Sequence, residues 1–223
     1  MKLSSINITT KALLTCGILA GPVYVLVTLF EMFIRPGFDP TRHDWSLLSN
    51  GDLGWIHIAN FFVTGALVVA AAVGVNRVLK GRWAALLLGL YGIGLIVSGI
   101  FVADPMNGFP IGTPEGAPVN PTVYGLMHII SGALAFIGLI GACFVFARHF
   151  FRIKKQALAI FSLVTGIGFL GAFFGIASSS QYQGTALQII VLTFTAAVLL
   201  AWIWLGVISA YLKNKNYETK GDI

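Results

Sequence analysis

Six long runs of apolar residues, separated by polar segments, make up most of this chain. The runs cover about residues 12–34, 55–79, 83–102, 123–147, 156–177 and 185–212. Each is close to, or longer than, the roughly 20 residues that an α-helix needs to cross a hydrocarbon core about 30 Å thick. The pattern therefore predicts an all-α bundle of six transmembrane helices, which forms a single domain over residues 1–223.

The composition favours the same class of protein. Hydrophobic residues are 57% of the chain and charged residues are 10%, whereas a soluble domain has about 25% charged residues. The net charge of +6 does not indicate a nucleic-acid partner, because the basic residues cluster at the ends of the apolar runs. We expect a multi-pass protein of the cell membrane, with membrane lipid as its surroundings and a second copy of the chain as the candidate protein partner.

The distribution of charge predicts the orientation. Twelve of the fourteen Lys and Arg residues lie in the N-terminal segment, the second and fourth connections and the C-terminal tail. Because basic segments stay on the cytoplasmic side of a membrane, both termini are expected in the cytoplasm, an N-in/C-in arrangement. Trp202 and Trp204 are then expected at the inner interface, where aromatic side chains form a belt.

The longest polar interruption in the first half is RPGFDPTRHDWSLLSNGDLGW, residues 35–55. It carries three of the eight acidic residues and follows the first span. Asp44 is expected to cap a short segment in which Trp45, Leu47 and Leu48 lie on the membrane interface. Since the predicted orientation places this loop outside, we expect it to cover any site at the outer ends of the helices.

Candidate catalytic residues come from the third and fourth spans. His128 lies within the fourth span, and an ionisable residue inside a span is a functional candidate. Tyr124 and Ser131, at i−4 and i+3, share its helix face and are candidate binding residues. Asp104 follows the third span at the same predicted level. His128 and Asp104 are therefore the candidate acid–base pair.

Further candidate binding residues are Arg35, Asp39 and His57, which the predicted topology places at the same outer level. Histidines and carboxylates are the residue types that bind metal ions or transfer protons, and paired histidines also ligate haem in membrane proteins. No H-E-x-x-H motif is present, so we predict no cofactor and keep a metal ion as an alternative. The other alternative is structural: these polar groups hydrogen-bond the helix ends together.

Several short motifs occur in a fixed order along the chain. They are R-P-G-F-D-P at residues 35–40, W-S-L-L at 45–48, Gly54-Trp55, Asn60-Phe61, Gly65, Asp104 and His128. In this order they resemble the DUF998 family of small bacterial and archaeal membrane proteins, and the resemblance extends over most of the chain. It implies six spans and directs attention to Asp39, Asp104 and His128. It implies no reaction, because the function of that family is unknown.

Two functional hypotheses follow. The first is a protein that binds or carries a lipid or a small apolar molecule at the outer side of the membrane. The alternative is a membrane enzyme that acts on a lipid-linked substrate at the outer leaflet with Asp104 and His128. An ion- or proton-coupled transporter is less favoured, because no carboxylate lies at the middle of any span.

Overall fold

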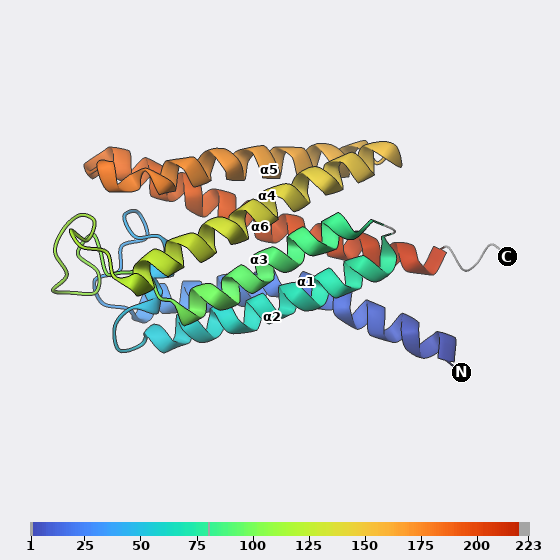
Figure 1. Ribbon diagram of the computed structural model, residues 1–223, viewed down its shortest axis with the longest axis horizontal. Coiled ribbons are helices and arrows are strands. Elements are labelled where there is room, and N and C mark those ends of the chain that lie inside the picture. The colour runs from blue at the N-terminus through green and yellow to red at the C-terminus, as the bar shows by residue number, and fades with distance from the viewer. Residues whose placement is uncertain (1, 80, 219–223) are drawn as a thin grey trace.

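The computed structural model describes residues 2–79 and 81–218, and its long elements are all helices. Six of these helices are long and apolar enough to cross a membrane, and the described part of the chain contains no strand. They are α1 (Lys2–Ile34), α2 (Gly54–Val78), α3 (Arg82–Ile100), α4 (Val123–Arg152), α5 (Gln156–Ala177) and α6 (Gly184–Glu218). The prediction of an all-α bundle with six membrane-spanning helices is confirmed (Figure 1).

The six helices form a closed ring. Each helix packs mainly against its neighbours in sequence, and α6 returns to pack against α1. Both termini lie at one end of the bundle, together with the α2–α3 and α4–α5 connections (Figure 1). We call this the terminal end. The other end carries the three remaining connections, residues 35–53, 101–122 and 178–183, and we call it the loop end.

Glycine allows α2 and α3 to approach closely. A Cβ atom on Gly65 would lie 2.7 Å from the carbonyl oxygen of Gly92, and one on Gly92 would lie 2.8 Å from the carbonyl oxygen of Gly65. Helices in lipid have no hydrophobic driving force for association, so the close packing that small residues allow holds them together instead. The close crossing fixes α3 relative to α2 and therefore fixes the positions of the residues that α3 presents to the ring interior.

The terminal half of the bundle is filled by large side chains. Phe146, Phe150 and Trp204 are fully buried there, and the Trp204 indole N–H donates to Ser162 Oγ at 2.9 Å. Trp202 is buried as well. The prediction that Trp202 and Trp204 belong to an interfacial belt is therefore wrong: both side chains point into the protein, where packing buries the indole rings.

A short 3-10 helix, η1 (Trp45–Ser49), plugs the loop end against α1 and α2. Asp44 caps it as predicted, accepting a hydrogen bond from the Ser46 amide at 3.0 Å. However, Trp45, Leu47 and Leu48 are buried within the bundle. The prediction that they lie on the membrane interface is wrong, because Trp45 packs on Tyr24 of α1, and Leu47 and Leu48 pack with Phe109 of the loop after α3.

Helix α4 is longer than its apolar run. The sequence suggested a basic connection from Arg148 to Lys155, but the helix continues through Arg152. Basic residues near a helix C-terminus interact favourably with its exposed carbonyl groups, so His149 and Arg152 suit the last turn. The α4–α5 connection is correspondingly short.

Candidate functional site

A cavity of about 530 Å³ occupies the loop-end half of the ring, and all six helices contribute to its walls. Its floor is an aromatic cluster from three helices: Tyr24 of α1, Tyr91 of α3 and Trp202 of α6. The ring centroid of Trp202 lies 5.0 Å from that of Tyr24 and 5.7 Å from that of Tyr91. Because Tyr91 is the central residue of α3 (Arg82–Ile100), this floor lies at mid-depth in the bundle.

The length of the cavity matches one leaflet of a bilayer. Its lining residues on α4 run from Gly125 to Phe136, and a helix rises 1.5 Å per residue, so the lined stretch is about 16 Å long. Half of a typical hydrocarbon core is about 15 Å. The cavity therefore extends from the middle of the membrane-spanning region to its edge at the loop end.

The walls are mostly apolar and rich in aromatic rings, including Phe61, Phe136, Phe169, Phe173 and Phe194. Charged and ionisable side chains gather toward the loop end, where Asp44, Asp104 and His128 line the cavity. None of the described lining residues is Lys or Arg. The site is thus an aromatic chamber with a weakly acidic rim.

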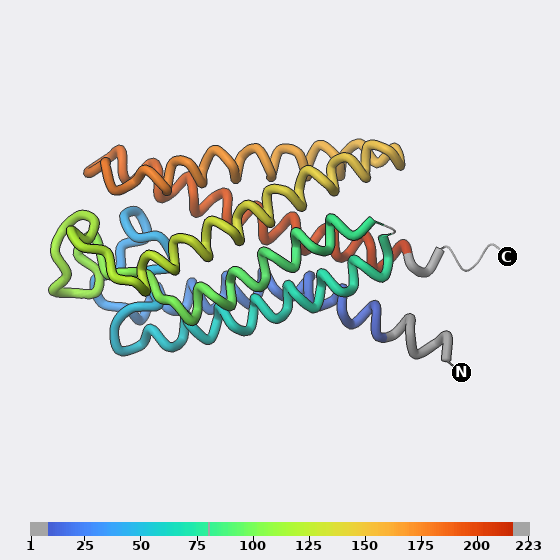
Figure 2. Tube along the Cα trace, in the orientation of Figure 1, coloured from blue at the N-terminus to red at the C-terminus, as the bar shows by residue number. Residues whose placement is uncertain are grey.

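One part of the cavity wall lies between α4 and α5. The two helices touch where Phe136 packs on Phe169 and Phe173, with ring centroids 5.0 and 5.5 Å apart. Beyond this contact they diverge toward the loop end (Figure 2). Ile129 of α4 and Ala177 of α5 both line the cavity and are also exposed on the surface, Ile129 by 63%. This part of the wall is therefore exposed at the surface of the bundle, at the level of the hydrocarbon core.

His128 lies in the wall with a defined tautomer. Its Nδ1 is 2.7 Å from the carbonyl oxygen of Phe101 and 3.2 Å from that of Ser98. Carbonyl oxygens only accept hydrogen bonds, so Nδ1 must carry the hydrogen. In the neutral ring, Nε2 is then the acceptor. His128 joins α4 to the end of α3 and leaves one ring nitrogen for a further interaction.

Asp104 holds the first turn of α4. Its two carboxylate oxygens accept hydrogen bonds from the Thr122 amide at 2.8 Å and the Thr122 hydroxyl at 2.6 Å. The Thr122 hydroxyl in turn accepts from the Gly125 amide at 3.0 Å, as an N-cap residue does. Asp104 lines the cavity, but both of its oxygens already have donors from the chain.

Tyr124 and Ser131 share a helix face with His128, and this face packs against the end of α3. The Tyr124 ring lies 5.6 Å from the Phe101 ring, and Ser131 Oγ lies 3.0 Å from Ser98 Oγ. Tyr124 is exposed at the surface and Ser131 is buried. Neither residue is among those that line the cavity.

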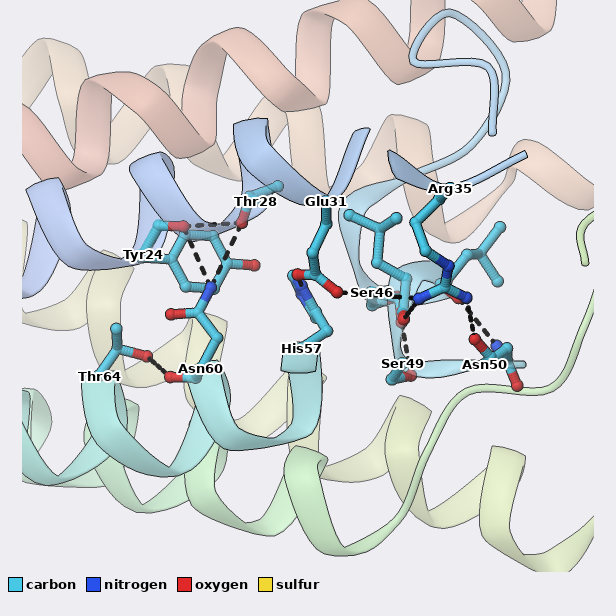
Figure 3. Close-up of polar contacts among 12 residues, drawn as sticks. Tyr24, Thr28, Glu31, Arg35, Ser46, Ser49, Asn50, His57, Asn60 and Thr64 are labelled. Atoms are coloured by element: carbon cyan, nitrogen blue, oxygen red, sulfur yellow. Dashed lines mark hydrogen bonds and ion pairs between the residues drawn. The ribbon is translucent and has the colours of Figure 1, made fainter. Parts of the chain in front are cut away.

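A separate buried polar group joins α1, α2 and the loop after α1 (Figure 3). His57 Nδ1 lies 2.7 Å from Glu31 Oε2, and both side chains are 0% exposed. Arg35 Nη1 lies 3.8 Å from the other oxygen, Glu31 Oε1. The sequence did not predict that Glu31 pairs with His57, because the two residues lie 26 positions apart on different helices.

Arg35 also fixes η1. Its guanidinium donates to the carbonyl oxygen of Leu48 at 2.8 Å and to that of Asn50, and it lies 5.3 Å from the centroid of the Phe109 ring. Burial lowers the pKa of Arg35, while the nearby Glu31 carboxylate acts in the opposite direction. Arg35 therefore links the buried ion pair to the plug that closes the loop end.

Asp39 organises the loop rather than the cavity. Burial acts to raise its pKa, but hydrogen bonds from the Thr41 amide and hydroxyl, at 2.9 and 2.7 Å, outweigh this, so the pKa of Asp39 is lowered. The Asp39 amide donates to His43 Nδ1 at 2.9 Å, and His43 Nε2 lies 2.9 Å from the carbonyl oxygen of Asn107. His43 therefore ties residues 35–53 to residues 101–122.

The structure thus divides the predicted residues into three groups. His128 and Asp104 lie in the cavity wall, Arg35 and His57 belong to the buried group with Glu31, and the other candidates support loops or helix contacts. Within the described ranges, no three His, Cys, Asp or Glu side chains converge on a point that could hold a metal ion.

The floor residues Tyr24 and Tyr91 were missed by sequence reasoning. A signal was present, since each tyrosine lies near the centre of its apolar run. A tyrosine hydroxyl buried at that depth needs a hydrogen-bond partner, which makes such a position unusual. Trp202 was missed because it was assigned to the interface.

The fold and the site define a small polytopic membrane protein with a chamber at one end. The chain matches the family described as a protein of unknown function, DUF998, over residues 18–211, and it belongs to that family. The match includes every residue of the floor and of the buried polar group. No curated protein and no solved structure matches the chain.

Proposed function

We propose that this protein binds a lipid or another small apolar molecule in the chamber between its helices, on the outer side of the cell membrane. The observation that carries the proposal is an aromatic cavity of about 530 Å³, as long as one leaflet, with exposed lining residues on α4 and α5 that we take as a lateral opening toward lipid. Ligand pockets in proteins are typically 300–1,000 Å³ in volume, mostly apolar, with a few polar groups. This chamber has both properties.

The lateral opening supports a ligand that comes from the bilayer. A molecule that enters between α4 and α5 passes Ile129 and Ala177 without leaving the apolar phase. Entry through the loop end would instead require passage beside Asp44 and Asp104. Since the transfer of apolar surface into water is unfavourable, the sideways route suits a membrane-dissolved molecule.

The proposed location of the chamber on the outer side of the membrane is based on the distribution of Lys and Arg residues. The terminal end carries the N-terminal segment, the tail and the two basic connections, which together hold twelve of the fourteen Lys and Arg residues. If these remain in the cytoplasm, the loop end and its chamber face outward.

The alternative, an enzyme that uses Asp104 and His128 on a lipid-linked substrate, receives less support from the geometry. Both oxygens of Asp104 accept hydrogen bonds from Thr122, so the contacts of this carboxylate position the start of α4 rather than a substrate. His128 keeps one ring nitrogen for a ligand, which suits orientation of a bound molecule as well as proton transfer.

Two matched glycine substitutions test the proposal. Gly132 lines the cavity and a Cβ atom there would meet open space, so Gly132→Leu should fill the chamber without a clash. Gly171 on α5 is exposed, has no neighbour within 4 Å of its Cβ position and does not line the cavity, so Gly171→Leu is the control. Both changes add the same side chain to a helix.

The measurement is quenching of tryptophan fluorescence by a brominated long-chain alkane in detergent micelles, because Trp45 and Trp202 line the chamber. We expect saturable quenching in the unmodified protein and in Gly171→Leu, and its loss in Gly132→Leu. Equal quenching in all three proteins would overturn the proposal, since it would place the alkane on the outer surface.

A further inference from the structure

The floor of the chamber carries hydrogen-bond donors that have no partner. The indole N–H of Trp202 is fully buried and unpaired, and so is that of Trp45, which also lines the chamber. Tyr24 and Tyr91 also line the chamber and are more than nine-tenths buried. Their hydroxyl groups, which are not fully enclosed, form no hydrogen bond with a described residue. A buried donor without an acceptor costs about 1–3 kcal/mol, so two such indoles together with two unpaired phenols beside one cavity need an explanation.

The donors share a location. The Tyr24 ring contacts both indoles, with ring centroids 5.9 Å from Trp45 and 5.0 Å from Trp202, and the Tyr91 ring also contacts Trp202. An indole only donates, and a phenol donates readily. A bound oxygen atom with lone pairs is therefore the group that the deep end of the chamber would stabilise.

The charges of the lining residues further restrict the class of ligand that the chamber can bind. The described lining contains no Lys or Arg, while Asp44 and Asp104 stand toward the loop end. An anionic headgroup would find no cation in the chamber and would meet two carboxylates at the rim, and an ion buried in such a low-dielectric site without a partner is strongly disfavoured. A carboxylate or a phosphate is thus excluded from the deep site.

We propose that the ligand is an uncharged molecule with a long apolar body and a hydrogen-bond-accepting oxygen, such as a carbonyl oxygen. This oxygen enters the chamber first and binds at the floor formed by Tyr24, Tyr91 and Trp202. This inference rests on the proposed function and names the ligand class of the same chamber. The aromatic walls hold the apolar body, and the floor donors recognise the oxygen at mid-membrane depth.

The test compares three probes of equal chain length: a long-chain methyl ketone, the alkane and the fatty-acid anion. Each competes in detergent micelles with the brominated alkane that quenches tryptophan fluorescence. We expect the ketone to displace it about three- to tenfold better than the alkane, the value of one hydrogen bond to a neutral group, and the anion to be the weakest.

The phenol groups are tested by Tyr24→Phe and Tyr91→Phe, which remove one oxygen each and keep the ring. Tyr182→Phe, at an exposed position outside the chamber, is the matched control. We expect the preference for ketone over alkane to fall about three- to tenfold in Tyr24→Phe or Tyr91→Phe and to persist in Tyr182→Phe.

The outcomes separate this inference from the proposed function. If ketone and alkane displace the reporter equally in the unmodified protein, or if the anion is preferred, the ligand class is wrong although the chamber still binds apolar molecules. If Gly132→Leu has no effect on the reporter, the proposed function itself fails.

Discussion

At the scale of single residues, the loop end is held together by buried polar contacts. The group of Glu31, His57 and Arg35 is one of them, and its members come from α1, α2 and the loop after α1. Such a group contributes little net stability over apolar packing, but the loss of one member leaves an uncompensated charge. In this protein the group fixes the position of η1, because Arg35 also donates hydrogen bonds to the carbonyl groups at the end of η1.

The first prediction concerns Glu31. Glu31→Gln removes the negative charge and leaves Arg35 buried beside a neutral amide, so the folded protein should lose about 3–5 kcal/mol of unfolding free energy. Thermal unfolding in detergent measures the loss. The comparison is Arg42→Gln, which breaks the exposed pair with Glu115, whose side chains are 36% and 68% exposed. That change should cost less than about 1 kcal/mol, and similar losses in both variants would contradict the assignment.

The polar contacts show what could not be predicted from the sequence at this scale. Arg35, His57, Asp104 and His128 were recognised because ionisable residues are rare in such a chain. Their partners were not, since a hydrogen bond between positions as distant as Glu31 and His57 depends on how α1 and α2 cross. The Asp104 contacts with Thr122 likewise depend on the path of a long loop.

At the scale of elements, α4 is the helix on which the chamber depends most. Its first turn is fixed by Asp104 and Thr122, its next turns carry His128 and Gly132 in the wall, and Phe136 marks the contact with α5. A displacement of its start would change both the wall and the lateral opening.

Two alanine substitutions on α4 test this arrangement. A Cβ atom on Gly125 would lie 2.1 Å from an Asp104 carboxylate oxygen, so Gly125→Ala should displace the cap and lower stability by about 1–3 kcal/mol. Gly132→Ala meets open space and should raise stability by up to about 1 kcal/mol through helix propensity. Thermal unfolding of both variants checks the signs, and equal shifts would show that Asp104 does not anchor the helix.

The sequence predicted where the six helices lie along the chain, but it did not predict which side of each helix faces lipid and which faces the protein interior. Apolar length alone located all six helices, because a membrane requires about 20 apolar residues and closed backbone hydrogen bonding. Helices that are apolar all round carry no polar stripe to mark which side faces lipid. For this reason Trp202 was assigned to the interface and η1 to the membrane surface, although both are buried in the protein.

At the scale of the whole molecule, the ring of six helices is filled at the terminal end and hollow at the loop end. Large side chains such as Trp204 and Phe150 close the first half, and the Tyr24–Trp202–Tyr91 cluster separates it from the chamber. A molecule bound in the chamber would reach mid-depth in the bundle, where it would meet the packed side chains of the described terminal half.

The orientation is tested by labelling single cysteines in intact cells with an impermeant reagent. Both native cysteines, Cys16 and Cys143, are first replaced by alanine. Val119→Cys, at the exposed loop end, should react, and Arg152→Cys, near the terminal end, should react only after permeabilisation. The reverse pattern would place the chamber toward the cytoplasm and contradict the proposed outer location.

The most direct measurement of the central claim is the position at which a photoactivatable alkyl chain, with its reactive group in mid-chain, attaches to the protein in a bilayer. Binding in the chamber predicts attachment to inward-facing residues such as Phe136, Phe173 and Phe194, with loss of this labelling in Gly132→Leu and its persistence in Gly171→Leu. Attachment confined to lipid-facing residues such as Leu26 and Phe33 of α1 would show that the chain remains outside the ring, and it would contradict the account.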